Sequence, residues 1–440
     1  MLLNLLPFGI VLGGGYFLIC TRAFFLFHPR KTLALLRTHC KRDKRSSFRR
    51  MSLALAGTLG VGNITGVAAG IVIGGAGSVF WLLLSALFSA PLKYAESVAV
   101  LSLPPGEKTK GFPTFVRHRF HLFGAPLSAL YAALSVTLAL AMGSALQSAA
   151  VMETARALGT RFLPYIAAAL FAVFLITSIQ GSSARICRIT AFLIPFAMIL
   201  YTILCIITIF SNIYRLPSVI FTVLTEAFSF RSFAGGVLGS MGASALREGF
   251  LRGLLSNEAG AGTSAYAHAK SEEGDPVAEG ILGMGEILFD TLLLCMLTAL
   301  SILVSVGDLS AYTDGMALLC AAFSSVFGTR YALPLFASVF LFALSTAVCW
   351  YEYGRCALSF LGREQNALFT FLYVIAAILG AFLGSMALIP LCDTVLFFLT
   401  AIALPALIKN GAATRALTIS ALQFEREAPS KSRVAAKEKI

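Results

Sequence analysis

Glycines gather around one polar side chain in a long apolar segment. Residues 56–63 read Ala-Gly-Thr-Leu-Gly-Val-Gly-Asn, so Gly57, Gly60 and Gly62 precede Asn63. Each glycine costs a helix up to about 1 kcal/mol relative to alanine, and these three do not share one helix face. We expect the segment to interrupt a helix and to free main-chain carbonyl and N–H groups. Such groups bind ions and polar ligands without a buried opposing charge.

Two more polar side chains lie in apolar surroundings. Asp290 begins the apolar stretch 291–306, and Gln147 is the lone amide of 139–152. An acid within a membrane segment is costly unless it is paired, interfacial or bound to an ion, so Asp290 is a candidate ligand. Pairing with a neighbouring helix end is the structural alternative for Asp290, and an interhelical hydrogen bond is the alternative for Gln147.

The composition of the chain predicts that these residues lie on membrane-spanning helices. Of the 440 residues 58% are apolar and 12% are charged, about half the charged share of a soluble domain. Because one span takes about 20 apolar residues, the sequence predicts an all-α polytopic membrane protein with eleven spans. They lie near 2–27, 51–75, 78–103, 124–152, 162–184, 189–211, 232–266, 277–307, 331–360, 366–389 and 391–409.

The distribution of basic residues predicts the orientation. Between the first two spans, residues 28–50 hold nine Lys or Arg and one acid, Asp43, so this connection is expected on the cytoplasmic side. The N-terminus is then outside, the C-terminal tail is cytoplasmic, and the protein is integral to the plasma membrane. The excess of basic residues therefore indicates the orientation of the chain in the membrane and not nucleic-acid binding. The arginines that fall on outside connections are Arg156, Arg161, Arg215, Arg231 and Arg330.

Glycine content divides the chain. The segments 51–77 and 232–262 each contain eight glycines, and each opens a group of five spans once the first span is set aside. This predicts an extra N-terminal span and basic loop (1–50), two inverted five-helix repeats (51–215 and 216–410) and a cytoplasmic tail (411–440) too polar to pack from Arg415 onward. The glycines at 62, 66, 70 and 74 recur every four residues, which close helix packing alone explains.

Several other classes of function are excluded. The nine cysteines form no C-x-x-C pair, no histidine has metal-ligand spacing, and no phosphate-binding G-x-x-x-x-G-K-[ST] motif occurs. The stretch Gly260-Ala-Gly-Thr-Ser-Ala265 fits a dinucleotide fingerprint but lacks the βαβ setting that motif needs. We therefore expect no enzyme and no organic cofactor.

Ordered motifs along most of the chain resemble one family. They are Gly57-Thr-Leu-Gly-Val-Gly-Asn-Ile-Thr-Gly-Val67, Gly74-Gly-Ala-Gly-Ser-Val-Phe-Trp81, Lys93-Tyr-Ala-Glu96, Arg252-Gly-Leu-Leu-Ser-Asn-Glu-Ala-Gly-Ala-Gly262, Ala267-His-Ala269, Phe289-Asp-Thr291, Phe342-Ala-Leu-Ser-Thr346 and Trp350-Tyr-Glu-Tyr-Gly354. Together they are similar to the alanine or glycine:cation symporters. The chain departs from that pattern at Val61, at Gly111-Phe-Pro-Thr114 and at Leu255, which bears on the identity of the substrate.

The resemblance implies the LeuT-type fold and symport of a small neutral amino acid with Na⁺. It implies a sodium site made of the carbonyls of Ala56, Leu59 and Phe342 with the hydroxyls of Ser345 and Thr346. A hydroxyl that bonds back to its own helix is the alternative for the last two. A second cation would use the Thr58 carbonyl, the Asn63 amide oxygen and Asp290.

The amino-acid substrate brings a carboxylate and an ammonium group. We expect the N–H groups of Val61, Gly62 and Asn63, at the start of the second half-helix, to face the carboxylate. For the ammonium group, the candidates are Gln147 and broken-helix carbonyls near Gly242 and Ser244. Trp350 is a candidate to close the side-chain end of the pocket, and an interfacial anchor is its alternative.

Some charged residues fit structural or gating roles. Lys93 and Glu96 are three apart on one helix face, which predicts a mutual pair. Glu258 and Arg252 are candidates for an inner gate. We expect a monomer that contacts membrane lipid. A proton-coupled carrier of the same fold, with Asp290 or Glu258 titrating, is one alternative, and a transport-inactive membrane sensor is another.

Overall fold

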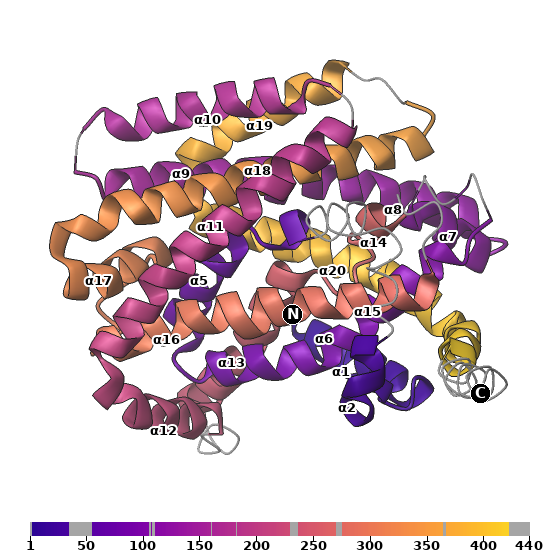
Figure 1. Ribbon diagram of the computed structural model, residues 1–440, viewed down its shortest axis with the longest axis horizontal. Helices are drawn as coiled ribbons and strands as arrows, with labels where there is room; N and C mark the ends of the chain where they lie inside the picture. The colour runs from indigo at the N-terminus through magenta and orange to yellow at the C-terminus, as the bar shows by residue number, and fades with distance from the viewer. Residues whose placement is uncertain are drawn as a thin grey trace, which may run out of the picture.

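The computed structural model describes residues 2–34, 55–104, 107, 111–159, 161–181, 183–228, 236–269, 275–363 and 367–421, and this part of the chain is helical (Figure 1). The α-helices are α1 (Leu6–Cys20), α2 (Phe24–Phe27), α5 (Thr65–Gly74), α6 (Ser78–Leu101), α7 (Phe112–Arg119), α8 (Gly124–Leu138), α9 (Leu146–Arg156), α10 (Leu163–Ile179), α11 (Ser183–Ser211), α12 (Leu216–Ala227), α13 (Gly236–Asn257), α14 (Ala265–His268), α15 (Pro276–Ile287), α16 (Met296–Ser305), α17 (Gly315–Phe327), α18 (Ala332–Phe360), α19 (Ala367–Leu383) and α20 (Ser385–Lys409).

Some helices continue into one another or are joined by short turns. The π-helices η4 (Ala139–Ala145) and η7 (Leu288–Cys295) join α8 to α9 and α15 to α16, and so make single long spans. The 3₁₀ turns are η1 (Leu2–Leu5), η2 (Val61–Asn63), η5 (Ile213–Arg215) and η8 (Gly328–Tyr331). Within the described ranges, seven helical segments are long and apolar enough to cross a membrane, and three apolar helices of 10–17 residues accompany them. This confirms the all-α polytopic fold.

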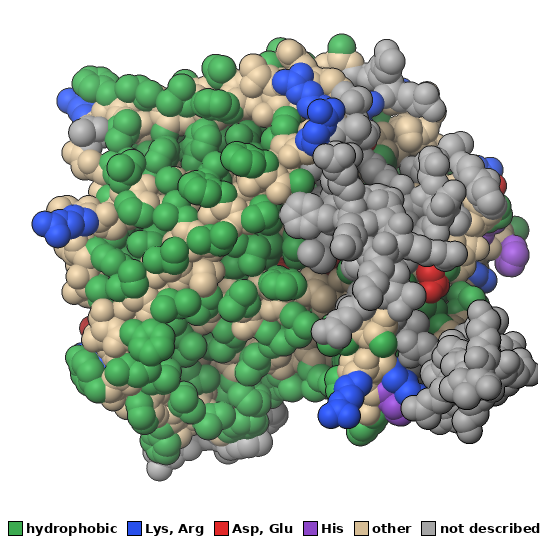
Figure 2. All heavy atoms as spheres, viewed as in Figure 1, with side chains coloured by type: hydrophobic (Ala, Val, Ile, Leu, Met, Phe, Trp, Pro, Cys, Tyr) green, Lys and Arg blue, Asp and Glu red, His purple; other side chains and the backbone are tan. Residues whose placement is uncertain are grey.

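The outer surface is apolar where lipid would lie. In the view of Figure 2, hydrophobic side chains cover most of the left and centre, and blue Lys and Arg side chains lie at the left edge and toward the right. Because water is absent from a bilayer core, main-chain groups must be satisfied within the protein, which helices achieve. In Figure 1 most of the long helices, among them α10, α15 and α18, run roughly from left to right.

Two predicted boundaries were wrong. The first predicted span, 2–27, stops at Cys20, because Arg22 and Ala23 adopt left-handed backbone angles (φ 54° and 45°). The last two spans meet at Gly384 (φ 82°) and not near 390, since Pro390 and Pro405 are both inside α20. A positive φ suits glycine and ends a helix.

Three helices were not predicted. The helix α7 lies within a polar connection, and α12 and α17 are only 12 and 13 residues long, too short for a search based on span length. The start of α17 is fixed by Asp314, whose side chain accepts the N–H groups of Met316 and Ala317 at 2.7 and 3.4 Å. Carboxylate caps of this kind are favourable at helix N-termini.

The tail prediction was also wrong in part. Residues 411–421 are helical, and Thr414 and Thr418 are fully buried. The Thr418 hydroxyl lies 2.6 Å from the Tyr94 hydroxyl on α6, so this part of the tail packs against the transmembrane helices. The prediction for 422–440 lies outside the described residues.

The glycine ridge is a packing surface, as its four-residue period indicated. A methyl group at Gly62, Gly66 or Gly74 would lie 3.0–3.3 Å from Leu255 or Glu248 of α13, and Gly70 faces Arg252 of the same helix. Small residues let helix backbones approach closely in membranes. The ridge thus presses α5 against α13 and brings the two glycine-rich segments side by side.

Candidate ion and substrate site

The first glycine-rich segment is broken, as predicted. Residues 55–58 are helical, Gly60 is extended (φ −107°, ψ −169°), η2 follows, and α5 begins at Thr65. Freed carbonyls find partners on α18: Ala56 accepts from the Thr346 hydroxyl at 2.9 Å, and Gly57 accepts from the Trp350 indole N–H at 3.2 Å. A Cβ on Gly60 would lie 2.9 Å from the Thr346 hydroxyl, so this close approach requires glycine.

Three of the five residues predicted for the first sodium site, Ala56, Leu59 and Thr346, come together at this break, and the other two, Phe342 and Ser345, precede Thr346 in α18. The Thr346 hydroxyl donates to the Ala56 carbonyl and also lies 3.4 Å from the Leu59 carbonyl. The adjacent Ser345 hydroxyl donates to Phe342 at 2.9 Å, which is the bond within its own helix considered above. All five residues are buried, and the cluster offers only neutral oxygens. Such a set suits an alkali cation, because it replaces water without burying an opposing charge.

The structure also brings together Asn63 and Asp290. The Asn63 side-chain amide donates to one carboxylate oxygen of Asp290. The hydroxyls of Ser256 and Thr291 donate to the other oxygen, at 2.6 and 3.1 Å. Among the described atoms the Asn63 amide oxygen is buried without a hydrogen-bond partner. A buried oxygen in this condition beside a carboxylate fits a cation ligand.

The other predicted ligand of this second site has a local partner. The Thr58 carbonyl accepts the Gly60 N–H at 2.8 Å across the break. It therefore belongs to the same turn that exposes the Ala56 and Leu59 carbonyls.

The second break was predicted in the wrong place. The helix α13 is continuous through Gly242 and Ser244, so these residues free no carbonyl, and the Ser244 hydroxyl donates to Ile73 at 3.3 Å. The chain unwinds instead between α13 and α14, where Glu258, Gly260 and Gly262 have positive φ values of 55°, 88° and 81°. The signal was the pair Gly260 and Gly262 after Asn257, which repeats the glycine spacing before Asn63.

Sequence reasoning missed the carbonyl of Leu255. In a continuing α-helix this carbonyl would accept from the Ala259 N–H, but that N–H donates to the Asn257 side chain at 3.0 Å. The Leu255 oxygen lies 3.3 Å from the position of a Cβ on Gly62. A freed carbonyl therefore faces the first break from the second, as an ammonium ligand would require.

The predicted pairing of Lys93 with Glu96 was wrong, because both side chains hold the second break. Glu96 accepts from the N–H groups of Gly260 and Gly262 and from the Ser264 hydroxyl, the last two at 3.0 and 2.9 Å. The Lys93 ammonium donates to the Asn257 carbonyl at 2.7 Å. Both side chains are fully buried.

An ionic network continues from Lys93. Its ammonium nitrogen lies 3.4 Å from Glu286, whose other oxygen lies 2.9 Å from the His268 Nε2. The His268 Nδ1 lies 3.2 Å from Glu279. The network therefore connects α6, α14 and α15, and buried charges that are paired in this way fix how helices sit against one another.

The groups predicted to hold the substrate carboxylate lie at the first break. The Val61 N–H donates to the Gln147 side-chain oxygen at 3.3 Å, and the Asn63 N–H donates to the Gly60 carbonyl at 3.3 Å. Gln147 in turn donates to Met142 at 2.9 Å. Gln147 of α9 thus lies next to Gly60 and Val61 of the broken helix.

Trp350 is fully buried, which rules out the interfacial anchor. Its ring lies 5.3 Å from that of Tyr353, and its indole N–H donates to the Gly57 carbonyl.

Arg252 does not pair with Glu258. It forms ion pairs with Asp393 of α20 and, at 3.4 Å, with Glu248. The Glu258 carboxylate accepts instead from the Thr263 hydroxyl at 2.6 Å. The Arg252 side chain packs beside Gly70 of α5.

Comparison with known proteins identifies the family and the fold of the chain. The chain is 29% identical to the sodium/alanine symporter AgcS of Methanococcus maripaludis, over 87% of this chain and 85% of that protein. It is 30% identical to the probable sodium/glutamine symporter GlnT of Bacillus subtilis, over 74% of this chain and 67% of that one. The crystal structure of MhsT in complex with L-phenylalanine covers 85% of this chain and 98% of its own, with a TM-score of 0.54 at 13% identity, and so shows the LeuT fold.

Residues 1–429 match the family described as the sodium:alanine symporters. This family consists of sodium-coupled amino-acid transporters and not of enzymes. From its first span to the buried part of its tail, the chain belongs to the sodium:alanine symporter family.

Proposed function

We propose that this protein carries a small neutral amino acid, alanine or glycine, into the cell together with Na⁺ by alternating access. The observation that carries the proposal is the pair of breaks side by side. One break presents the Ala56 and Leu59 carbonyls to Thr346, and the other presents the Leu255 carbonyl to Gly62. Main-chain dipoles at half-helix ends can hold a zwitterion and an alkali cation with no buried opposing charge.

In this proposal the two ions have different surroundings. The first is held by neutral oxygens of Ala56, Leu59, Phe342, Ser345 and Thr346. The second lies at Asn63 and Asp290, with Thr58 contributing its carbonyl. The N–H groups of Val61, Gly62 and Asn63 face the substrate carboxylate, Gln147 adjusts their orientation, and the Leu255 carbonyl replaces Gly242 and Ser244 as the ammonium partner.

The proposed cycle uses the repeats 51–215 and 216–410 as the parts that rock against each other. The N-terminus lies outside and the tail lies in the cytoplasm of a plasma-membrane protein. Sodium binding orders the first break and completes the amino-acid site. The membrane potential then contributes about 2.3 kcal/mol per charge per 100 mV to inward movement.

Uptake into proteoliposomes tests the proposal. Radiolabelled alanine should accumulate when Na⁺ is the outside salt, and should not accumulate with choline. Unlabelled glycine should compete and glutamine should compete weakly, which separates this chain from a carrier with the substrate named for GlnT. Equal accumulation in Na⁺ and choline would contradict sodium coupling.

A proton-coupled carrier is the second candidate, because Asp290 is a buried carboxylate at the break. One relative, from Bacillus subtilis, is named a putative sodium/proton-dependent alanine carrier protein, at 28% identity. Asp290 accepts from three donors, and the amide oxygen of one of them, Asn63, has no hydrogen-bond partner among the described atoms, which favours a metal cation at this carboxylate. Uptake driven by a pH gradient in sodium-free medium would support the proton instead.

A further inference from the structure

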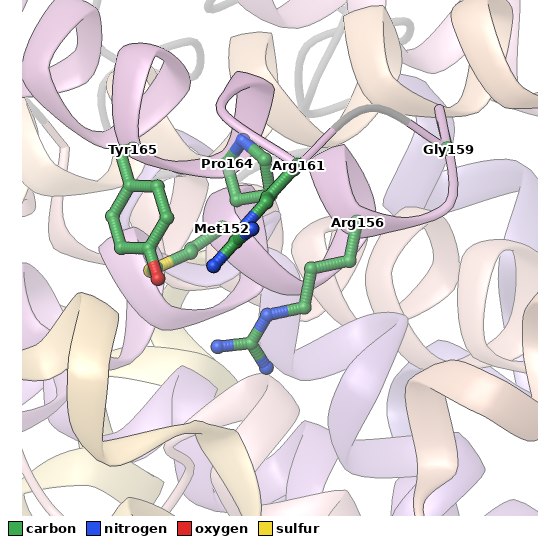
Figure 3. Close-up of a pocket in the computed structure, with 6 residues that line it drawn as sticks. All are labelled: Met152, Arg156, Gly159, Arg161, Pro164 and Tyr165. Carbon is green, nitrogen blue, oxygen red and sulfur yellow. The ribbon is translucent and has the colours of Figure 1, made fainter.

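A surface cavity lies away from the breaks, at the ends of two spans. Its volume is about 390 Å³, and it is lined by Met152, Arg156, Gly159, Arg161, Pro164 and Tyr165 (Figure 3). These residues come from the end of α9, the start of α10 and the connection between them. In the view of Figure 3 both guanidinium groups and the Tyr165 phenol extend to the same side of this connection. The cavity is therefore basic and open, with an apolar floor at the buried Met152 and Pro164.

Among the described residues, neither arginine of the cavity is held in an ion pair with an acid. Within the described ranges, neither guanidinium forms an ion pair or a side-chain hydrogen bond. Glu153 is one turn before Arg156, but both of its oxygens accept from Ser385, at 2.6 and 2.8 Å. Two positive charges with free donors suit a phosphate group, which a guanidinium binds through two parallel hydrogen bonds.

These arginines are also exceptions to the charge pattern of the chain. They are two of the few basic residues on connections expected outside, where the positive-inside rule disfavours them. Another exception, Arg215, has a structural reason, since it donates to the Val304 and Ser305 carbonyls at 3.3 and 3.4 Å. The structure offers no such protein partner for Arg156 and Arg161 in the described residues.

An apolar stripe runs from the cavity along α10. Phe162, Ile166, Leu170 and Phe174 are each at least 48% exposed, and they recur every four residues on one face. This stripe extends about 18 Å along the helix, slightly more than half of the about 30 Å hydrocarbon core. The neighbouring α19 adds Leu379, Phe382 and Leu383, each at least 57% exposed, and the Phe382 ring lies 6.2 Å from that of Tyr165. In Figure 1 α10 and α19 lie at one edge of the molecule.

We propose that the cavity is a binding site for the phosphate of an anionic phospholipid, with the acyl chains along the α10 and α19 stripe. Arg156 and Arg161 bind the phosphodiester, and the Tyr165 hydroxyl is a further donor at the level of the headgroups. The apolar stripe next to the basic cavity favours a lipid over a soluble anion, because a free phosphate has no apolar part that could contact the stripe. Basic pockets between spans bind anionic headgroups by the same chemistry.

The test measures lipid binding to the purified full-length protein in detergent. The probe is dioleoyl phosphatidylglycerol, with dioleoyl phosphatidylcholine as the neutral lipid and inorganic phosphate as the soluble anion. Wild type should be stabilised against heat by phosphatidylglycerol and should retain it in native mass spectrometry. The double variant R156Q/R161Q should bind it about 30-fold more weakly, since each basic residue near a membrane surface contributes about fivefold.

The matched control is R330Q. Arg330 is exposed and lies on another connection expected outside. The substitution removes one positive charge, and Arg330 does not line the cavity. R330Q should bind phosphatidylglycerol like wild type. If the double variant fails to fold, R156Q and R161Q alone should each weaken binding about fivefold.

Two outcomes would overturn the proposal. Equal binding of phosphatidylglycerol by wild type and the double variant would show that the cavity binds no lipid phosphate. Saturable stabilisation by inorganic phosphate as strong as that by phosphatidylglycerol, and lost in the double variant, would make the cavity a site for a soluble anion. Neither outcome depends on which amino acid the protein transports.

Discussion

The hydroxyl of Thr346 donates to the carbonyl of Ala56 at 2.9 Å, although 290 positions separate the two residues. The bond joins the end of a helical turn to the middle of α18, and it exists because the chain stops being helical at Gly60. These oxygens are among the ligands of the sodium site that we propose.

Replacing Thr346 with valine should weaken sodium coupling. Valine keeps the shape of threonine and removes the hydroxyl, so the proposed site loses one of five oxygens. The sodium concentration for half-maximal alanine uptake should rise about tenfold or more, which corresponds to about 1.4 kcal/mol. T137V is the control, because Thr137 is exposed and bonds only within its own helix at 3.0 Å. Equal sodium dependence in T346V and wild type would remove Thr346 from the site.

Replacing Gly60 with alanine should distort the first break. The added methyl would lie 2.9 Å from the Thr346 hydroxyl and 3.4 Å from the Gln147 oxygen. Overpacking of this kind costs about 1–3 kcal/mol, so both thermal stability in detergent and uptake should fall. Gly15 offers the comparison, since a Cβ there would meet nothing within 4 Å. A G60A protein that transports like G15A would show that this close approach is not needed.

Replacing Asp290 with asparagine should show whether this carboxylate binds Na⁺ or a proton. The change removes the charge next to Asn63 and keeps the size of the side chain. We expect loss of sodium-stimulated uptake, measured with sodium and choline gradients at one pH. The exposed Asp308 supplies the control variant D308N, in a connection far from the breaks. Uptake by D290N that keeps its sodium dependence but no longer responds to a pH gradient would assign a proton to this carboxylate.

Replacing Glu96 with glutamine should loosen the second break. The carboxylate accepts three hydrogen bonds from residues 260–264, and a bond to a charged group contributes about 1.5–3 kcal/mol. E96Q should melt at a lower temperature and transport more slowly, even with saturating Na⁺. The half-exposed Glu107, which pairs with His118 near the surface, gives E107Q as the control. A melting temperature for E96Q equal to that of E107Q would show that the break does not depend on this carboxylate.

Much of the fold could be predicted from the sequence because the bilayer imposes a simple rule. A span needs about 20 apolar residues, and a segment such as 78–103 that meets this need is a helix whatever its neighbours are. The same holds for the first break, since Gly57, Gly60 and Gly62 weaken a helix through their own conformational freedom. The resemblance of the motifs to a known family supplied the set around Thr346.

The short helices and the position of the second break could not be predicted from span length and glycine content. A glycine-rich segment such as 232–262 contains several places where a helix could end, and local propensity does not choose among them. In the structure the helix ends at Asn257, because Glu96 and Lys93 of α6 bind the freed main-chain groups there. The partners of Lys93, Glu96 and Arg252 in other segments are far away in the sequence. The separations range from 141 positions, between Arg252 of α13 and Asp393 of α20, to 193 positions, between Lys93 of α6 and Glu286 of α15.

Short segments of the sequence are enough to predict that the chain crosses a membrane many times and that a helix breaks near Asn63, since hydropathy and the conformational freedom of glycine are local properties. Packing between helices sets where the second helix unwinds, turns the Leu255 carbonyl toward Gly62, and selects the acids that pair with Lys93 and Arg252. The physical reason is that a buried polar group is stable only when a partner satisfies it, and the partner is chosen by packing between helices that are far apart in the chain.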